Sequence, residues 1–106
     1  MGIKLSHSFS IMKPVVVYPL IYVLELEENK WYVGITTNLN YRWGQHLSGE
    51  GAKWTRLHKP KRIVEIYSDN CDRKLEDEVT KKYVERYGRE NVRGGSWTKC
   101  DSAESE

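Results

Sequence analysis

The chain has 106 residues, 30% of them charged, and a mean hydropathy of −0.70, which fits one domain with a modest core and excludes two independent cores. Its longest apolar stretch, residues 15–26, contains Pro19 and is too short to cross a bilayer. Its start lacks a secretory leader pattern, so we expect an intracellular protein, located in the cytoplasm, the nucleoid or the nucleus. The two cysteines, Cys71 and Cys100, form no CxxC pair, which excludes a zinc ribbon. The chain has 17 basic and 15 acidic residues, so its net charge is only +2.

The first predicted element is a β-hairpin. Residues 1–17 show no sustained period, so we expect a flexible arm before a domain at 18–98. The β-rich run 20–26 predicts a strand, and the polar residues 27–30 predict a turn. Residues 31–36 are then expected to form the antiparallel partner strand.

A helix and a third strand are predicted next. Asn38 is a suitable N-cap for a helix that ends near Leu47. Leu39, Trp43 and Leu47 recur every fourth residue, so we expect them to form one buried stripe. After this helix comes a basic stretch expected to be a loop, and the alternation over residues 62–67 predicts a third strand that joins the hairpin.

A second helix is predicted over residues 72–87, with Gly88 suited to the position after its end. Its expected apolar row consists of Leu75, Val79, Tyr83 and Tyr87. Residues 91–95 are predicted to be a loop, and the acidic tail 99–106 is predicted to be disordered.

Charge is divided unevenly along the chain. Basic residues outnumber acids over 42–62 and again over 81–99, whereas acids outnumber basic residues over 65–78. Clustered positive charge is typical of proteins that bind a phosphate backbone, and a carboxylate patch between two such blocks is where a divalent cation can bind. An ordinary solvated surface would give the same alternation, so charge alone leaves both interpretations open.

Two tyrosines of the hairpin are the first candidate site residues. Tyr22 and Tyr32 share one sheet face only if the connection has an odd number of residues, as a three-residue loop at 28–30 would provide. Gly34 follows closely, and a glycine inside a strand often marks the close approach of a backbone or a ligand. Taken alone, the pair is better explained as two half-buried strand tyrosines.

The first predicted helix carries a second candidate pair. Arg42 and His46 lie four residues apart and therefore share a face beside the apolar stripe. An arginine there suits a phosphate that gains negative charge as water attacks, and His46 could bind the same phosphate or carry a proton. A surface arginine and a half-exposed histidine would be the ordinary alternative.

The second predicted helix supplies a candidate metal ligand. Glu78 lies beside Leu75 and Val79 at the edge of the apolar row, so of the acids here it is the best placed to hold Mg²⁺. The ordinary alternative is a helical ion pair with Lys82, one turn further on.

The order and spacing of these motifs resemble the GIY-YIG nuclease family over residues 20 to about 98. Leu20-Ile21-Tyr22 matches its Gly-Ile-Tyr, and Tyr32-Val33-Gly34 matches its Tyr-Ile-Gly. Further matches are Arg42 to the catalytic arginine, His46 to a histidine of many members, Glu78 to the metal-binding glutamate and Asn91 to an asparagine on the site's rim. Two departures are Leu20 in place of the first glycine and Ile35 where some members carry a lysine.

The resemblance implies an α/β (α+β) fold, a three-stranded antiparallel sheet flanked by helices, and an endonuclease acting on DNA. It implies that Glu78 holds one Mg²⁺ or Mn²⁺ and that Tyr22 orients or deprotonates water, which requires a lowered phenol pKa. Tyr32 would hydrogen-bond into this network, Arg42 would stabilise the phosphate, and His46 would assist. The residues expected to bind nucleic acid are Gly34, Lys53, Trp54, Arg56, Asn91 and Arg93, with Trp54 either stacking on a base or covering the sheet.

Two other functions stay open from the sequence. One is a non-catalytic nucleic-acid-binding module of the same fold. The other is a protein-interaction domain in which exposed Trp54 and Trp97 serve as anchors. For a nuclease of this size, a partner protein or a homodimer would supply specificity, and no membrane partner is expected.

Overall fold

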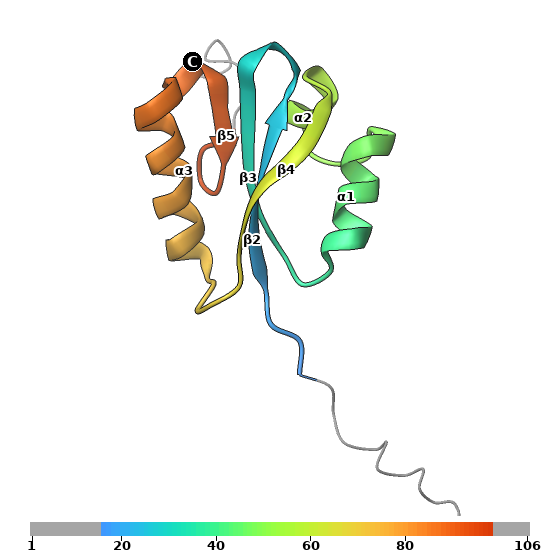
Figure 1. The fold of residues 1–106 in the computed structure, drawn as a ribbon, viewed down its shortest axis with the longest axis vertical. Helices are drawn as coiled ribbons and strands as arrows, with labels where there is room; N and C mark the ends of the chain where they lie inside the picture. The colour runs from blue at the N-terminus through green and yellow to red at the C-terminus, as the bar shows by residue number, and fades with distance from the viewer. Residues whose placement is uncertain (1–15, 99–106) are drawn as a thin grey trace, which may run out of the picture.

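The computed structural model describes residues 16–98 and forms one four-stranded sheet with helices on both faces. Helix α3 covers one face, and α1 and α2 lie over the other (Figure 1). The elements in chain order are β2 (Leu20–Leu26), the 3₁₀ turn η2 (Glu27–Asn29), β3 (Lys30–Thr36), α1 (Leu39–Ser48), α2 (Lys53–Leu57), β4 (Pro60–Tyr67), α3 (Arg73–Tyr87), the 3₁₀ turn η3 (Arg89–Asn91) and β5 (Val92–Gly94). Most of the predicted arm and all of the predicted acidic tail lie outside the described residues.

The sheet order is β4-β2-β3-β5, which corrects the prediction of three antiparallel strands. The three strands that were predicted do pair antiparallel, but β5 adds a fourth that runs parallel to β3. Residues 91–95 were expected to be a loop, because the strand within them has only three residues and is too short to show an alternating pattern in the sequence. Burial of Val92 against the core fixes this short strand instead.

The hairpin between β2 and β3 has the odd connection that the tyrosine spacing requires. Three residues, Glu27–Asn29, join the strands, and Leu26 pairs with Lys30. Glu28 and Asn29 both adopt left-handed backbone angles, with φ values of 68° and 59°. In the resulting register Tyr22 is opposite Gly34 and Leu24 is opposite Tyr32, so both tyrosines lie on the same sheet face.

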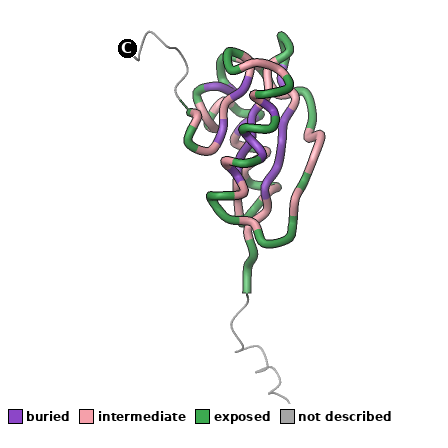
Figure 2. The backbone as a smooth tube through the Cα atoms, turned by 90° about the vertical axis from the view of Figure 1, so that its left-hand side faces the viewer, coloured by how far each residue is buried: buried purple, intermediate pink, exposed green. Residues whose placement is uncertain are grey.

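Strand β2 is buried on both faces, and Figure 2 shows this buried centre in purple. Ile21 and Val23 belong to the core under α3, which also includes Val33, Val79, Tyr83 and Val92. The alternate residues Tyr22, Leu24 and Leu26 pack with Tyr32 and Trp54 on the face of α1 and α2. The period-two alternation of a strand thus gives the chain one core on each side of its sheet.

Helix α1 begins and ends with the expected signals, but its buried residue differs from the prediction. The Asn38 side chain accepts a hydrogen bond from the Tyr41 backbone N–H at 3.1 Å, and Gly49 ends the helix with a φ of 85°. Leu47 is 50% exposed, so the predicted stripe of three buried residues is wrong at this end. His46 is buried in its place, because the face of α1 that meets the sheet runs through position 46.

Two further helix predictions need correction. The basic stretch expected to be a loop contains the five-residue helix α2, which buries Trp54 and Thr55. Helix α3 begins after Asp72, whose side chain accepts from the Leu75 N–H at 2.8 Å. The predicted apolar row of α3 does face the core, with Val79 and Tyr83 buried and Leu75 and Tyr87 partly buried, but the buried face also includes Glu76 and Thr80, which the prediction left out. Across the described residues, none of these helices is long and apolar enough to cross a membrane.

Strand β4 forms one edge of the sheet. Its pairing with β2 has two register shifts, one between Val23 and Leu24 and one between Glu25 and Leu26. The strand begins with Pro60, Lys61 and Arg62, and Glu25 of β2 forms ion pairs with the latter two at 3.5 and 2.7 Å.

Candidate active site

A cleft of about 580 Å³ opens at the end of the sheet where β2 begins and β3 ends. The first two turns of α1 and the first turn of α3 complete its wall. The lining residues are Pro19, Tyr22, Tyr32, Ile35, Thr36, Thr37, Asn38, Tyr41, Arg42, Gln45, Arg73 and Glu76. The cleft therefore gathers phenol, guanidinium and carboxylate groups from two strands and two helices, of which α3 is distant in sequence from the other three.

Tyr22, Tyr32 and Arg42 meet in this cleft, as predicted. The two phenol rings lie 6.3 Å apart, both on the face of the sheet that α1 covers. Gly34, opposite Tyr22, makes this possible, because a Cβ at position 34 would overlap the Tyr22 Oη and Cζ atoms. The predicted close approach at Gly34 is therefore that of the Tyr22 ring, and Gly34 does not line the cleft.

His46 lies behind Tyr22 with both ring nitrogens hydrogen-bonded inside the protein. Its Nε2 is 2.8 Å from the Tyr22 Oη, and its Nδ1 is 2.9 Å from the Thr55 Oγ1. The residue is only 1% exposed and does not line the cleft. His46 therefore contacts the Tyr22 hydroxyl but not the open cleft, an arrangement that favours the predicted proton-carrying role over the predicted direct contact with a phosphate.

Burial sets the protonation states of these groups. Burial raises the pKa of the Tyr22 phenol, as does the nearby Tyr32, and hydrogen bonding and charge from Arg42 only partly offset this rise. Burial also raises the pKa of Tyr32. The pKa of His46 is lowered to about 4, first by burial and then by the charge of Arg42. At neutral pH the phenols of Tyr22 and Tyr32 and the imidazole of His46 behind them are therefore uncharged, whereas the sequence analysis required a lowered phenol pKa.

Arg42 is oriented by its neighbour on α1. Its guanidinium donates to the Gln45 Oε1 at 2.8 Å, and the Gln45 side-chain amide donates to the Tyr41 hydroxyl at 3.3 Å. Gln45 thus connects the arginine of the cleft to an exposed aromatic ring at its mouth.

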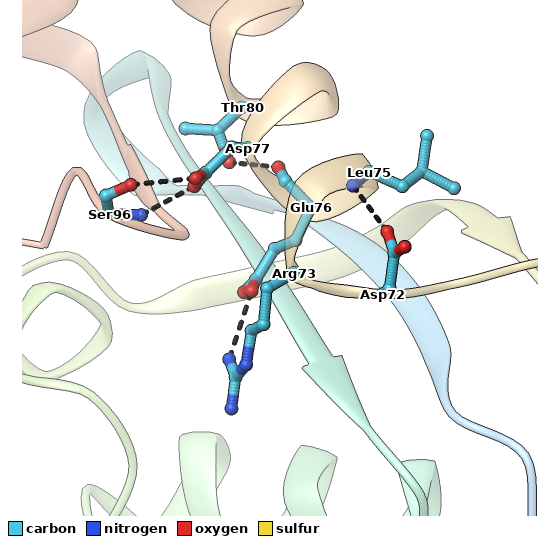
Figure 3. Close-up of polar contacts among 7 residues, drawn as sticks. All are labelled: Asp72, Arg73, Leu75, Glu76, Asp77, Thr80 and Ser96. Atoms are coloured by element: carbon cyan, nitrogen blue, oxygen red, sulfur yellow. Dashed lines mark hydrogen bonds and ion pairs between the residues drawn. The ribbon is translucent and has the colours of Figure 1, made fainter.

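The carboxylate of the cleft is Glu76, and this corrects the expectation for Glu78. Glu76 is 3% exposed and lines the cleft, whereas Glu78 is exposed and lies outside it. Residues two positions apart point to different sides of a helix, so only one of the two acids can face the site. Arg73 forms an ion pair with Glu76 at 3.1 Å, and Figure 3 shows the two side chains extending together from α3.

Asp77, the next acid on α3, has a structural partner. It accepts hydrogen bonds from the Ser96 backbone N–H at 2.7 Å and from the Ser96 hydroxyl at 2.8 Å (Figure 3). The turn at Gly95 fits closely against the same carboxylate, since a Cβ at Gly95 would overlap Asp77 Oδ1. Asp77 thereby fixes the chain after β5 onto α3 and leaves Glu76 as the carboxylate of the cleft.

The other predicted nucleic-acid contacts do not line the cleft. Trp54 is 5% exposed, donates from Nε1 to the Trp31 carbonyl at 3.0 Å, and lies 4.4 Å beneath the Arg93 guanidinium. This arrangement fits the covering role considered for Trp54. Asn91 accepts from Lys30 Nζ and donates to the Tyr87 carbonyl, both at 2.7 Å.

Three further residues singled out in the sequence, Lys53, Arg56 and Trp97, also lie outside the cleft. Lys53 and Arg56 are exposed on α2. Trp97, considered as an exposed anchor, is only partly exposed, and the Arg89 guanidinium lies 5.3 Å from its ring.

The cleft fits a hydrated divalent cation bound through one carboxylate. Among the described residues no three His, Cys, Asp or Glu side chains come together to enclose a metal ion. Mg²⁺ does not need such a group, because it is commonly held by one or two carboxylates while water and substrate phosphate fill its other positions. Glu76 offers hard oxygen ligands in a cleft of sufficient volume for such an ion.

The sequence contained a signal for Glu76 that the predicted apolar row concealed. Positions 76, 79, 80 and 83 follow helical spacing and form the buried face, but a glutamate and a threonine at two of them break the apolar pattern. Arg73, Gln45 and Thr55 gave no sequence signal of their own, because their roles depend on contacts with residues in other parts of the fold or helix.

Comparison with known proteins identifies a family. The GIY-YIG catalytic domain, which is associated with endonucleases, matches residues 18–91 of the chain. A UPF0213 protein of Fusobacterium nucleatum is 34% identical over 77 residues, covering 68% of this chain and 73% of its own length. UPF0213 protein YazA of Bacillus subtilis is 31% identical over 68 residues, covering 64% and 67%.

Other relatives match over a shorter range. A UPF0213 protein of Halalkalibacterium halodurans is 42% identical over 48 residues, covering 45% of this chain and 51% of its own. For this relative and two further UPF0213 proteins, the matched part of the chain spans about half of the relative's own length. No solved structure gives a significant match. The match to residues 18–91 includes Tyr22, Tyr32, Arg42 and Glu76, so the chain belongs to the GIY-YIG catalytic-domain family.

Proposed function

We propose that the chain is a metal-dependent endonuclease that hydrolyses phosphodiester bonds in DNA. The observation that carries the proposal is the meeting of Tyr22, Arg42 and Glu76 in one cleft, supported by membership of a family associated with endonucleases. These groups supply what phosphodiester hydrolysis requires: a proton acceptor for water, a cation for the phosphate and a carboxylate for a metal ion.

Glu76 would hold one Mg²⁺ or Mn²⁺. The bound ion would polarise the scissile phosphate and stabilise the leaving oxygen. Arg73 competes for the same carboxylate through its ion pair and would be displaced towards the substrate phosphates. Arg42, fixed by Gln45, donates to the phosphate oxygens as they gain negative charge.

Tyr22 would accept a proton from the attacking water while its own proton passes to His46 Nε2, 2.8 Å away. This transfer avoids a free phenolate, which the raised pKa of Tyr22 makes scarce at neutral pH. His46 is neutral at that pH and therefore able to receive the proton. Tyr32 keeps Tyr22 and Arg42 in position from the neighbouring strand.

Substitution of the two glutamates of α3 tests the proposal. Glu76→Gln is expected to lower Mg²⁺-dependent plasmid nicking at least about 100-fold, because it removes the charged ligand of the ion. Glu78→Gln makes the same chemical change two residues away, on the exposed side of α3, and is expected to keep full activity. Nicking is measured with Mg²⁺, with Mn²⁺ and with EDTA.

Two results would contradict the assignment: full activity of Glu76→Gln, or equal losses in both variants. DNA binding by the wild-type chain without any nicking in either metal would instead support a non-catalytic binding module.

A further inference from the structure

We propose that Thr55 is a positioning residue that holds His46 in the tautomer with hydrogen on Nδ1, so that Tyr22 directs its proton to His46 and its oxygen lone pairs to the cleft. The proposal deepens the nuclease function above and rests on it for the catalytic consequence. The tautomer itself is tested independently of any activity.

The direction of the hydrogen bonds follows from the proton on Thr55. A threonine hydroxyl carries one hydrogen, and a carbonyl oxygen can only accept. The Thr55 hydroxyl donates to the Ala52 carbonyl at 2.9 Å, the shortest of the three contacts that this oxygen accepts. Towards His46 Nδ1, also at 2.9 Å, the Thr55 oxygen must therefore accept, and Nδ1 carries the hydrogen.

The other nitrogen of the ring is then fixed as well. A neutral imidazole with hydrogen on Nδ1 has a bare lone pair on Nε2. His46 is 1% exposed, and burial favours its neutral form, so Nε2 accepts the hydroxyl proton of Tyr22. The three residues thus form a directed chain of hydrogen bonds in which Tyr22 donates to His46 and His46 donates to Thr55.

The loop between α1 and α2 brings Thr55 to this place. Gly51 packs against the His46 ring so closely that a Cβ at position 51 would overlap Nδ1. Thr55 lies one turn into α2, is 2% exposed, and reaches the ring from the side opposite Tyr22. This location places the Thr55 oxygen directly at Nδ1, where it can select one ring tautomer.

The tautomer decides whether Tyr22 can act on water. When His46 accepts, the phenolic oxygen is free to take a proton from a water molecule in the cleft as its own proton moves to Nε2. The O–H bond of water breaks, the O–H bond of the phenol is replaced, and a new N–H bond forms on His46. In the opposite tautomer His46 would donate to Tyr22, and the phenol proton would point into the cleft, where it blocks this transfer.

Histidine nitrogen NMR on the full chain reads the tautomer directly. In ¹⁵N-histidine-labelled wild-type protein at neutral pH, His46 is expected to show a protonated Nδ1 and a bare Nε2, with His46→Gln used for assignment. Thr55→Val keeps the side-chain shape but removes the acceptor, so the Nε2-protonated form is expected to become prominent. Thr55→Ser restores an acceptor and is expected to restore the wild-type pattern.

Thr80→Val is the matched control. Thr80 is also fully buried and also bonds a backbone carbonyl, that of Glu76 at 2.7 Å, but it does not contact His46. The same substitution there is expected to leave the tautomer of His46 unchanged. Because Thr80→Val removes an equally buried hydroxyl, it shows what the loss of a hydroxyl does by itself.

Kinetics then tests the catalytic consequence. Thr55→Val is expected to lower kcat at least about 10-fold with little change in DNA affinity measured in Ca²⁺, and Thr55→Ser is expected to recover most of the rate. A wild-type His46 protonated on Nε2 would overturn the proposal, whether or not Thr55→Val folds. A changed tautomer with an unchanged rate would overturn the catalytic role alone. If the wild-type chain shows no nicking, the proposed function fails, while the NMR result still decides what Thr55 does to His46.

Discussion

Gly34 shows how a residue without a side chain shapes the cleft. It lies opposite Tyr22 in the hairpin, and the Tyr22 ring crosses the space that a Cβ would fill. Its backbone angles do not require glycine, because φ lies outside the left-handed region. The glycine of this motif is therefore needed for the packing of a phenol and not for a turn.

Gly34→Ala is expected to displace Tyr22, to lower the free energy of unfolding by about 1–3 kcal/mol, and to reduce nicking strongly. Gly44→Ala is the matched control, because a Cβ at this helical position meets no atom within 4 Å. It is expected to raise stability by about 0.5–1 kcal/mol. Urea unfolding of both variants measures the difference, and equal stabilities would show that Tyr22 does not need the space.

At the scale of elements, the start of α3 positions the carboxylate of the cleft. The Asp72 side chain caps the helix by accepting from the Leu75 N–H, and Glu76 follows one turn later. The helix then crosses the sheet face with Val79, Thr80 and Tyr83 buried. Fraying of the first turn would therefore move the group proposed to hold the metal ion.

Asp72→Ala is expected to lower the free energy of unfolding by about 1 kcal/mol, because the first turn loses its cap. It is also expected to weaken Mn²⁺ binding, since Glu76 becomes less well fixed. Asp69→Ala removes the same charge from an exposed residue and is expected to change stability by less than about 0.5 kcal/mol. Unfolding curves and Mn²⁺ titrations that do not separate the two variants would contradict this role for the cap.

Elements with a local signal were predictable from the sequence. The hairpin strands and α1 lie within a residue of their predicted bounds, because β-branched runs, an Asn38 cap and Gly49 mark them in the chain itself. The shared sheet face of Tyr22 and Tyr32 followed from the odd connection of the hairpin, whereas the meeting of Tyr22 with Arg42 was implied by the family resemblance.

The remaining features depend on tertiary contacts that short patterns do not contain. Strand β5 and helix α2 are three and five residues long, too short for a period to appear. The choice of Glu78 over Glu76 came from assigning the apolar row by hydrophobicity, whereas the acid that lines the cleft is buried within that face. The hydrogen bonds of His46 link α1, β2 and α2, so no single segment predicts them.

At the scale of the whole molecule, the cleft exists only when the complete domain is folded. Its wall combines the start of β2, the end of β3 and the first turns of two helices on opposite faces of the sheet (Figure 1). His46 is buried behind this wall, between Tyr22 and Thr55, so its protonation is linked to global stability.

Stability is expected to fall as pH decreases from 6.5 to about 4. The pKa of His46 is about 4 in the folded chain, below its ordinary value of 6.5, so the unfolded chain binds the proton more readily over this window. The contribution of neutral His46 to the free energy of unfolding is fully present above pH 6.5, and its loss by about pH 4 lowers that free energy by roughly 3 kcal/mol. Urea unfolding from pH 4 to 7 measures the slope, and His46→Gln is expected to flatten it. Equal slopes in the two proteins would show that His46 remains an ordinary histidine.

The edge strand β4 has a consequence for how copies of this protein behave at high concentration. An open strand edge is a template for pairing with another chain and for aggregation. Proline at the first position, two adjacent cationic side chains, and two irregularities in the pairing with β2 all make a flat, continuous match to a second sheet unfavourable. Copies of this protein can therefore reach high concentration without joining their sheets into fibrils through β4.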